Sequence, residues 1–413
     1  MIAGEYLPRS RLFRRLKNGS HGQVIERYAV RLVEDGLAQQ GTWRCLNLVG
    51  DLISWIGRTR SRLTDLDERL VERFLRRRAT KHSIQPGDHA ALKRLLSVLR
   101  DAGMIAPAEP PRITRQDQIL AEFSDYLQRE RGLAPTSIVR YLPAIRRFLC
   151  EASPAGSDAL SKIDHVDVVG YVERHARDGS AMFGKAMCWS LRAFLRYLHH
   201  KGLNPVSLAG CVPSIKQWKL ANLPTYLSAE QVQKVLDSCD RTSPIGRRDY
   251  AILMMLAKLG LRANEVAPLT LDDIDWRSGE MRMQAKGRQR ARMPSPPDVG
   301  AAVVAYLRGA RPESSCRRLF LRTPAPRIGF KSSSTITRIA KTALERAGIR
   351  GFAHQGAHLF RHSLATELLR CGATLSEIGQ LLRHQGHDTT RIYAKVDIDT
   401  LRTLSLPWPG DVQ

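Results

Sequence analysis

Apolar residues recur every three or four positions along much of this chain, which is the spacing of helices that bury one face. In the first quarter of the chain, this spacing predicts four helices. They cover Ile25–Val33, Trp43–Ile56, about Asp67–Arg78 and His89–Asp101. We therefore expect this part to fold as a helical bundle.

The same plan returns after a loop rich in proline. Helical spacing is found again at Ile119–Leu127, Ile138–Phe148, Asp167–His175 and Trp189–His200. Both copies have Gly-Leu-Ala after their first helix, at residues 36–38 and 132–134, and both close on a glycine, Gly103 and Gly202. Two interpretations stay open: a tandem repeat, or two unrelated bundles that use the same type of turn.

The last part of the chain mixes helices with a small sheet. Ser228 is a good N-cap for a helix, and residues 248–259 form a strongly apolar helix. Met281–Ala285 and Arg290–Met293 read as two short strands around a Lys-Gly turn, and the pattern is helical again from Ser334. The predicted fold class is mainly α: two tandem helical bundles, then a mixed α+β domain with a small antiparallel sheet.

Proline-rich stretches and changes of pattern divide the chain into segments. We expect a basic arm (1–20), an N-terminal helical domain (21–107), a second helical domain (113–205), a linker (206–224), a third domain (225–406) and a tail (407–413).

The chain is strongly basic, with 65 Lys and Arg against 40 Asp and Glu and a net charge of +25. Residues 1–112 have 21 basic against 12 acidic side chains, residues 113–222 have 15 against 10, and residues 223–413 have 29 against 18. A bias for solubility would also give a positive charge. An excess in every segment is what a protein with nucleic-acid contacts along its whole length predicts.

Seven scattered cysteines without a Cys-x-x-Cys pair indicate reduced thiols. Arginines break up the first residues, so no signal peptide is expected, and no apolar run is long enough for a membrane span. We expect a cytoplasmic protein, associated with the nucleoid, with no membrane partner.

Six residues of the last third form a set that can bind and attack a phosphodiester without a metal. A guanidinium holds phosphate oxygens in a bidentate manner, and a tyrosine is a nucleophile once cations stabilise its phenolate. Each residue alone has an ordinary explanation, such as a surface ion pair or a core tyrosine. The candidate catalytic residues are Arg262, Lys286, His358, Arg361, His384 and Tyr393, with Glu265 expected to orient an arginine.

A metal site is the alternative at His358 and His362, which stand one helical turn apart. His354, His384 and His387 would be further ligands. Leu359 occupies the position where a zinc protease of this spacing has glutamate, and Arg361 between two ligands would repel a cation. We expect neither a metal nor another cofactor.

The joint pattern resembles the tyrosine recombinase, or phage integrase, family. The resemblance lies in His358-Leu-Phe-Arg361-His362, in Lys286-Gly followed by Pro294, and in the segment from Asp388 to Tyr393. It is strong over residues 225–405 and moderate over 113–205, the family's core-binding domain. The chain departs from the family at Gln289, Ala291 and Arg383, where Lys, Arg and Gly are usual.

The resemblance implies a clamp around double-stranded DNA and a 3′-phosphotyrosine formed by Tyr393. It implies that Arg262, Arg361 and His384 bind the phosphate, that His358 helps to accept the tyrosine proton, and that Lys286 protonates the leaving 5′ oxygen. It also implies a homotetramer on two duplexes, alone or with partner recombinases. The role is DNA integration, transposition or resolution, and a transposon-borne integrase with an extra N-terminal domain fits the length.

Three rival functions remain. A topoisomerase of type IB would use the same chemistry without a partner strand. A DNA-binding protein with a decayed site would lack some of the six residues, and all six are present. A zinc hydrolase would lose activity with a chelator.

Overall fold

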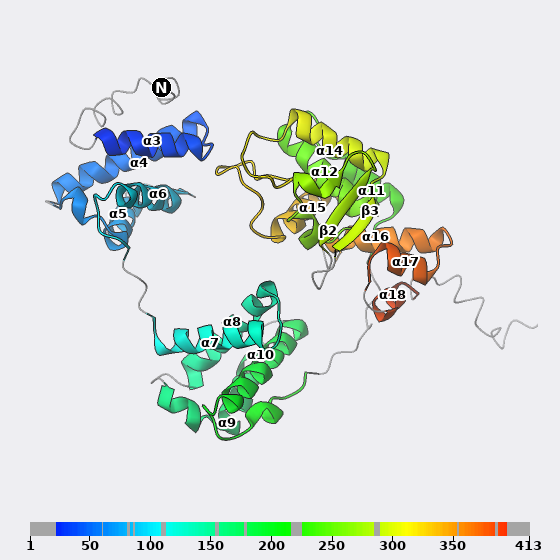
Figure 1. The fold of residues 1–413 in the computed structure, drawn as a ribbon, viewed down its shortest axis with the longest axis horizontal. Helices are drawn as coiled ribbons and strands as arrows, with labels where there is room; N and C mark the ends of the chain where they lie inside the picture. Colours follow the sequence, from blue (N-terminus) through cyan, green and yellow to red (C-terminus); the bar gives the residue numbers. More distant parts are fainter. Residues whose placement is uncertain are drawn as a thin grey trace, which may run out of the picture. The chain divides into compact units, whose positions relative to one another are not determined.

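The computed structural model of the 413-residue chain describes eleven ranges, given at the end of this paragraph. The predicted arm and tail, residues 216–224 of the predicted linker, and Lys286 lie outside them. Residues 108–221 form one compact unit, and residues 1–107 and 222–413 form the other (Figure 1). The ranges are 22–59, 61–80, 83–85, 87–108, 113–152, 157–176, 180–215, 225–284, 290–352, 355–384 and 387–394.

The N-terminal part is a bundle with its own core, formed by residues between Val24 and Ile105. Its helices begin and end close to the predicted positions, and Asp67 caps the third by accepting a hydrogen bond from the Leu70 amide. Trp43 was expected on the buried face but is 48% exposed. The elements are α3 (Gly22–Glu34), α4 (Gln39–Arg58), the 3-10 turn η1 (Leu63–Asp65), α5 (Glu68–Ala79) and α6 (Asp88–Asp101).

The second bundle also has a separate core, formed by residues between Ile119 and Val212. Aromatic rings dominate it; Phe123 lies 5.1 Å from Phe194 between ring centroids. The elements are α7 (Arg115–Arg129), α8 (Pro135–Ala152), η2 (Ser157–Lys162), α9 (His165–His175), α10 (Ala181–His200) and η3 (Leu208–Cys211).

The two bundles share the order of their elements and the backbone of their turns. In each, a 3-10 turn precedes a third helix capped by an aspartate, Asp67 or Asp164. The first helix of each ends at a glycine with positive φ, 78° at Gly36 and 62° at Gly132, a conformation that glycine adopts without strain. These matches favour the tandem repeat over two unrelated bundles.

The third part, from Ala229 to Ala394, contains the helices and strands around the predicted site. Strands β2 and β3 pair antiparallel, as predicted, with Arg282 opposite Arg292. The two-residue strand β1 was not predicted; it pairs with β2 and gives the order β1-β2-β3. The elements are α11 (Ala229–Asp237), α12 (Pro244–Lys258), α13 (Ala263–Val266), η4 (Leu271–Asp273), β1 (Ile274–Asp275), β2 (Glu280–Gln284), β3 (Arg290–Pro294), α14 (Pro297–Gly309), α15 (Ser334–Arg346), α16 (Ala357–Arg370), α17 (Leu375–Leu381) and α18 (His387–Ala394).

Helix α12 is the centre of this part, since every residue from Ala251 to Ala257 is buried. It packs against α14 and α16. A second, smaller cluster consists of Ala365, Ile378, Leu382 and Tyr393. Ala365 belongs to α16, Ile378 to α17 and Tyr393 to α18, and Leu382 directly follows α17. The predicted nucleophile is therefore part of a small satellite core.

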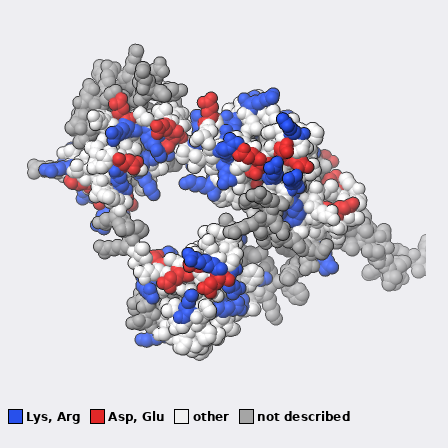
Figure 2. Space-filling model, viewed as in Figure 1, with Lys and Arg blue, Asp and Glu red and all other residues white. Residues whose placement is uncertain are grey.

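Lys and Arg side chains lie on the visible face of all three parts of the chain (Figure 2). This agrees with the basic excess in each segment of the sequence. Among the helices of the described ranges, none has the length and apolar character that crossing a bilayer requires.

Candidate active site

A buried carboxylate joins two arginines at the start of α13. Glu265, 2% exposed, accepts hydrogen bonds from Arg262 Nη1 at 2.7 Å and from Arg383 Nη2 at 3.0 Å. It also accepts the Arg262 amide at 2.9 Å, so it caps α13. Burial alone would raise the pKa of Glu265, but these bonds and the charges of Arg383 and Arg262 leave it below its ordinary value. The carboxylate thus stays ionised and holds both guanidinium groups.

Arg361 is fixed by backbone carbonyl groups. It is 3% exposed, its Nη1 donates to the Gly260 carbonyl at 2.5 Å, and its Nη2 donates to the Leu382 carbonyl. Gly260 has φ +58°, and a Cβ there would lie 2.7 Å from Leu382 Cδ2, so only glycine fits this position. Each nitrogen keeps a second N–H for another acceptor.

Glu265 pairs with Arg262 and Arg383 and Arg361 donates to carbonyl groups, so the three guanidinium groups leave the site with an excess of positive charge. Burial lowers the pKa of Arg361 to about 10, with Arg262 acting in the same direction. Burial also lowers the pKa of Arg383, and its Nε is buried without a hydrogen-bond partner. An anion placed here would relieve the repulsion, because buried like charges need a counter-charge.

Tyr393 meets this cluster from α18. Its side chain is 1% exposed, and its hydroxyl shares a 2.9 Å hydrogen bond with His362 Nδ1. Burial raises the pKa of Tyr393 to about 12, although Arg361 and Arg262 act in the opposite direction. At neutral pH the phenol therefore holds its proton and needs a base before it can attack.

His384 lies on the other side of the tyrosine ring. The two rings are parallel within 5°, with centroids 6.4 Å apart. His384 Nδ1 shares a 2.8 Å hydrogen bond with the Thr390 hydroxyl. Burial and the charges of Arg361 and Arg262 together lower the pKa of His384 to about 4. The imidazole is therefore neutral at physiological pH.

Five of the seven residues named from the sequence thus gather around one place: Arg262, Glu265, Arg361, His384 and Tyr393. His358 is exposed on α16, one turn before His362 and with its ring centroid 6.4 Å from that of His362. Lys286 lies outside the described residues. Sequence reasoning did not assign a role to His362, although its spacing of four from His358 placed it on the same helical face.

Arg383 is the second residue that the sequence left open. With arginine where the family usually has glycine, the sequence allows two alternatives: Gly386 supplies the helix cap, or Arg383 contributes another phosphate contact. Arg383 itself adopts the left-handed conformation after α17, with φ 55°, and it contacts Glu265. Gly386 lies outside the described residues.

Among the described residues, no group of three or more His, Cys, Asp or Glu side chains could hold a metal ion. His354 and the His387 side chain, two of the ligands considered for a zinc site, are outside that description.

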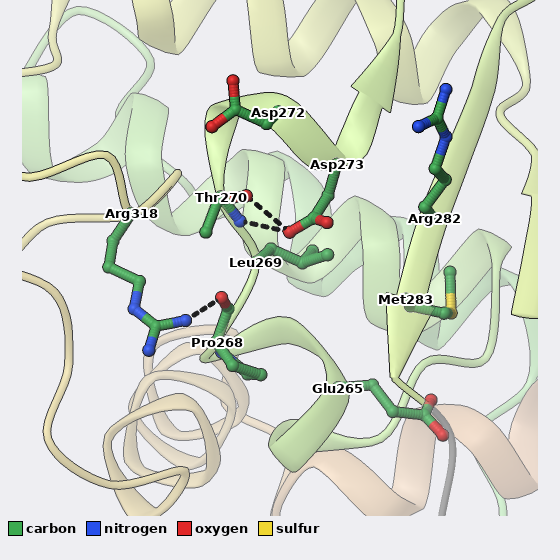
Figure 3. A pocket seen from close by; sticks show the side chains of 9 residues that line it. All are labelled: Glu265, Pro268, Leu269, Thr270, Asp272, Asp273, Arg282, Met283 and Arg318. Carbon is green, nitrogen blue, oxygen red and sulfur yellow. Dashed lines mark hydrogen bonds between the residues drawn. The ribbon is translucent and has the colours of Figure 1, made fainter. Parts of the chain in front are cut away.

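A pocket of roughly 410 Å³ adjoins the site on the sheet side (Figure 3). Glu265 lies at its edge, and its carboxylate points away from Asp272 and Asp273. The other charged groups already have partners: Asp273 accepts from Thr270 at 2.7 Å, and Asp272 pairs with Arg317. The pocket therefore shares Glu265 with the site, while Asp272 and Asp273 have partners outside that site.

Comparisons with known proteins agree with this architecture. Residues 225–399 match the Phage integrase family, and residues 120–203 match the Phage integrase, N-terminal SAM-like domain. A protein of Sinorhizobium fredii named as an integrase/recombinase, y4rA, is 38% identical over 391 residues, which is 94% of each chain. The chain therefore belongs to the tyrosine recombinase, or phage integrase, family of site-specific DNA recombinases.

Two further relatives match a smaller share of this chain. Tyrosine recombinase XerD of Listeria monocytogenes is 30% identical and is covered over 94% of its length by only 68% of this chain. The crystal structure of XerH bound to palindromic difH substrate has the same fold, with a TM-score of 0.53 and 20% identity over 83% of this chain and 97% of that chain. About a third of this chain thus has no counterpart in that XerD.

Proposed function

We propose that the protein breaks and rejoins DNA strands with Tyr393 as the nucleophile. The observation that supports this best is a buried phenol under the positive charge of Arg361 and Arg262, in a site where Glu265 pairs with Arg262 and Arg383. Such a site stabilises a phenolate and a pentavalent phosphorane by fixed positive charge, without a metal.

The roles of the other residues follow from their chemistry. Arg262 and Arg361 bind the non-bridging oxygens of the scissile phosphate, and Glu265 holds Arg262 in place. His384, neutral, donates a hydrogen bond to the same phosphate. Lys286 protonates the leaving oxygen, and His358 assists the tyrosine. These assignments extend the family resemblance to this chain residue by residue.

Atoms balance in the proposed step. The Tyr393 oxygen forms a bond to phosphorus, and the bond from phosphorus to the 5′ oxygen breaks. The 5′ oxygen leaves with the bonding electrons and takes a proton, which gives a 3′-phosphotyrosine and a free 5′ hydroxyl. A 5′ hydroxyl of a partner strand then gives its proton back to Lys286 and attacks the phosphotyrosine, and the Tyr393 oxygen leaves and regains a proton. Because the ester is conserved, no external energy source is required.

We also propose a three-domain division, with residues 21–107 and 113–205 as helical domains and 225–406 as the catalytic domain, and the separate hydrophobic cores support it. All three contact duplex DNA, since each contributes basic side chains (Figure 2). Exchange of strands between two duplexes requires four cleavages, so the working assembly is a homotetramer, alone or with partner recombinases. Integration or transposition of a mobile element is the biological role that we propose.

The direct test is a nicked suicide duplex, recovered by selection from a random-sequence pool and incubated with the protein. Wild type should trap a covalent protein–DNA adduct that resists denaturing electrophoresis, and Tyr393→Phe should give none. Tyr306→Phe, at another buried tyrosine of the same domain, is the matched control and should retain the adduct. Adduct formation by Tyr393→Phe would refute the proposed nucleophile.

A further inference from the structure

Helix α16 presents two histidines to the site, and the one in contact with the tyrosine hydroxyl is His362. Its Nδ1 lies 2.9 Å from Tyr393 Oη, and the ring centroids are 5.6 Å apart with planes tilted by 58°. His358 is one turn earlier and exposed. The hydrogen bond thus joins a half-buried imidazole to the oxygen that would react.

Packing holds His362 and Tyr393 in position relative to each other. Arg361, the preceding residue, is anchored on the Gly260 and Leu382 carbonyl groups, and this sets the rotation of α16. The tyrosine side chain packs with Ala365, which lies one turn after His362 on the same face. The ring is therefore held by apolar contact, and the direction of its oxygen is set by His362.

We propose that His362 is the catalytic proton acceptor for Tyr393, an inference that rests on the proposed function. With its own proton on Nε2, the neutral imidazole accepts the phenol hydrogen at Nδ1. As the Tyr393 oxygen bonds to phosphorus, the O–H bond breaks and the proton passes to Nδ1. When a 5′ hydroxyl later attacks the phosphotyrosine, the phenolate leaves and regains this proton.

The surrounding charges suit such a transfer. The groups that face this pair are Arg361 and His358 on α16, Arg262 and Glu265 on α13, and Arg383 and His384 between α17 and α18. The charges of Arg361 and Arg262 act to lower the pKa of Tyr393, so they favour the phenolate that remains when the proton leaves.

The test separates proton transfer from positioning. In His362→Asn the amide oxygen occupies nearly the place of Nδ1, so it still accepts the hydrogen bond but cannot take the proton. We expect adduct formation on the suicide duplex to slow by about 100-fold at pH 7, the scale of general base catalysis. The deficit should shrink as the pH rises, because hydroxide then ionises the phenol. His358→Asn, the same change one turn away at a residue that only assists, should give a smaller loss.

A more acidic nucleophile provides the second measurement. Fluorotyrosine placed at position 393 should restore much of the His362→Asn rate, since its phenol ionises without help. A 5′-bridging phosphorothiolate substrate needs no acid for its leaving group and should leave the deficit unchanged. Binding of the same duplex, measured by gel shift, checks that the variant is folded.

Several outcomes would overturn the inference. They are a wild-type rate in His362→Asn, an equal deficit at every pH, or rescue by the phosphorothiolate rather than by fluorotyrosine. The wild-type adduct, and its loss in Tyr393→Phe, test the proposed function independently of any of these results.

Discussion

At the scale of single residues, Arg383 combines two opposing effects. Its backbone is left-handed, which costs a residue with a Cβ about 1 kcal/mol relative to glycine, while its side chain contacts the buried Glu265. Arg383→Gly and Arg383→Ala both lose the contact, so their difference isolates the backbone. We expect the glycine variant to be more stable than the alanine variant by about 1 kcal/mol, measured by hydrogen exchange of α16 in urea. Equal stability would show that the backbone at this position is unstrained.

The pKa of His384 gives a second prediction at this scale. Its folded pKa is about 4 and its ordinary value 6.5, so the unfolded chain binds the proton more readily. Stability is complete above pH 6.5 and is lost as the pH falls toward 4. Solvent screening reduces the effect of this half-buried group to about 1 kcal/mol at pH 5. His384→Gln should lose less stability than wild type between pH 7 and pH 5 in the same exchange experiment. A parallel decline of both proteins would contradict this.

At the scale of elements, the sequence predicted most helices because their caps and apolar spacing are local. Asp67 and Ser228 cap the helices that they precede. Strand β2 begins and ends one residue earlier than predicted, and β3 ends one residue later. Strand β1 escaped prediction because two residues have no periodicity, and its pairing depends on β2. Sequence patterns therefore predict the elements that local interactions stabilise, and they miss an element that depends on pairing with another strand.

The rotation of α16 about its own axis is a feature that such local patterns do not predict. The sequence places His358, Arg361 and His362 on one face, and this spacing leaves open which histidine meets the tyrosine. The choice depends on Arg361, which is bound to carbonyl groups 101 and 21 positions away in the chain. Likewise, Arg383 took the helix-ending position for which the family resemblance suggested glycine. The residue set could thus be predicted, and its internal contacts could not.

At the scale of the whole molecule, basic charge is present in every part, and the extra bundle adds its own share. Helix α5 exposes Arg69, Arg73, Arg76 and Arg77, whereas α9, at the corresponding place in the second bundle, has Arg174 as its one arginine or lysine. The repeat thus kept its fold while the surface charge of the third helix diverged. This points to α5 as the DNA-contacting helix of the N-terminal bundle.

Replacing these four arginines by glutamine, in the full-length chain with Tyr393→Phe to prevent covalent trapping, tests that contact. Each phosphate contact adds about 0.9 to the slope of log affinity against log salt. The slope should therefore become shallower by about 2 to 4, and affinity at low salt should fall by at least tenfold. The four lysine replacements keep the charge and should retain the wild-type slope, because counterion release depends on charge rather than on guanidinium geometry. Adduct formation in the Tyr393 background at saturating protein should persist, since the active site belongs to another domain. An unchanged slope in the glutamine variant would remove α5 from the DNA interface and assign the N-terminal bundle a different role.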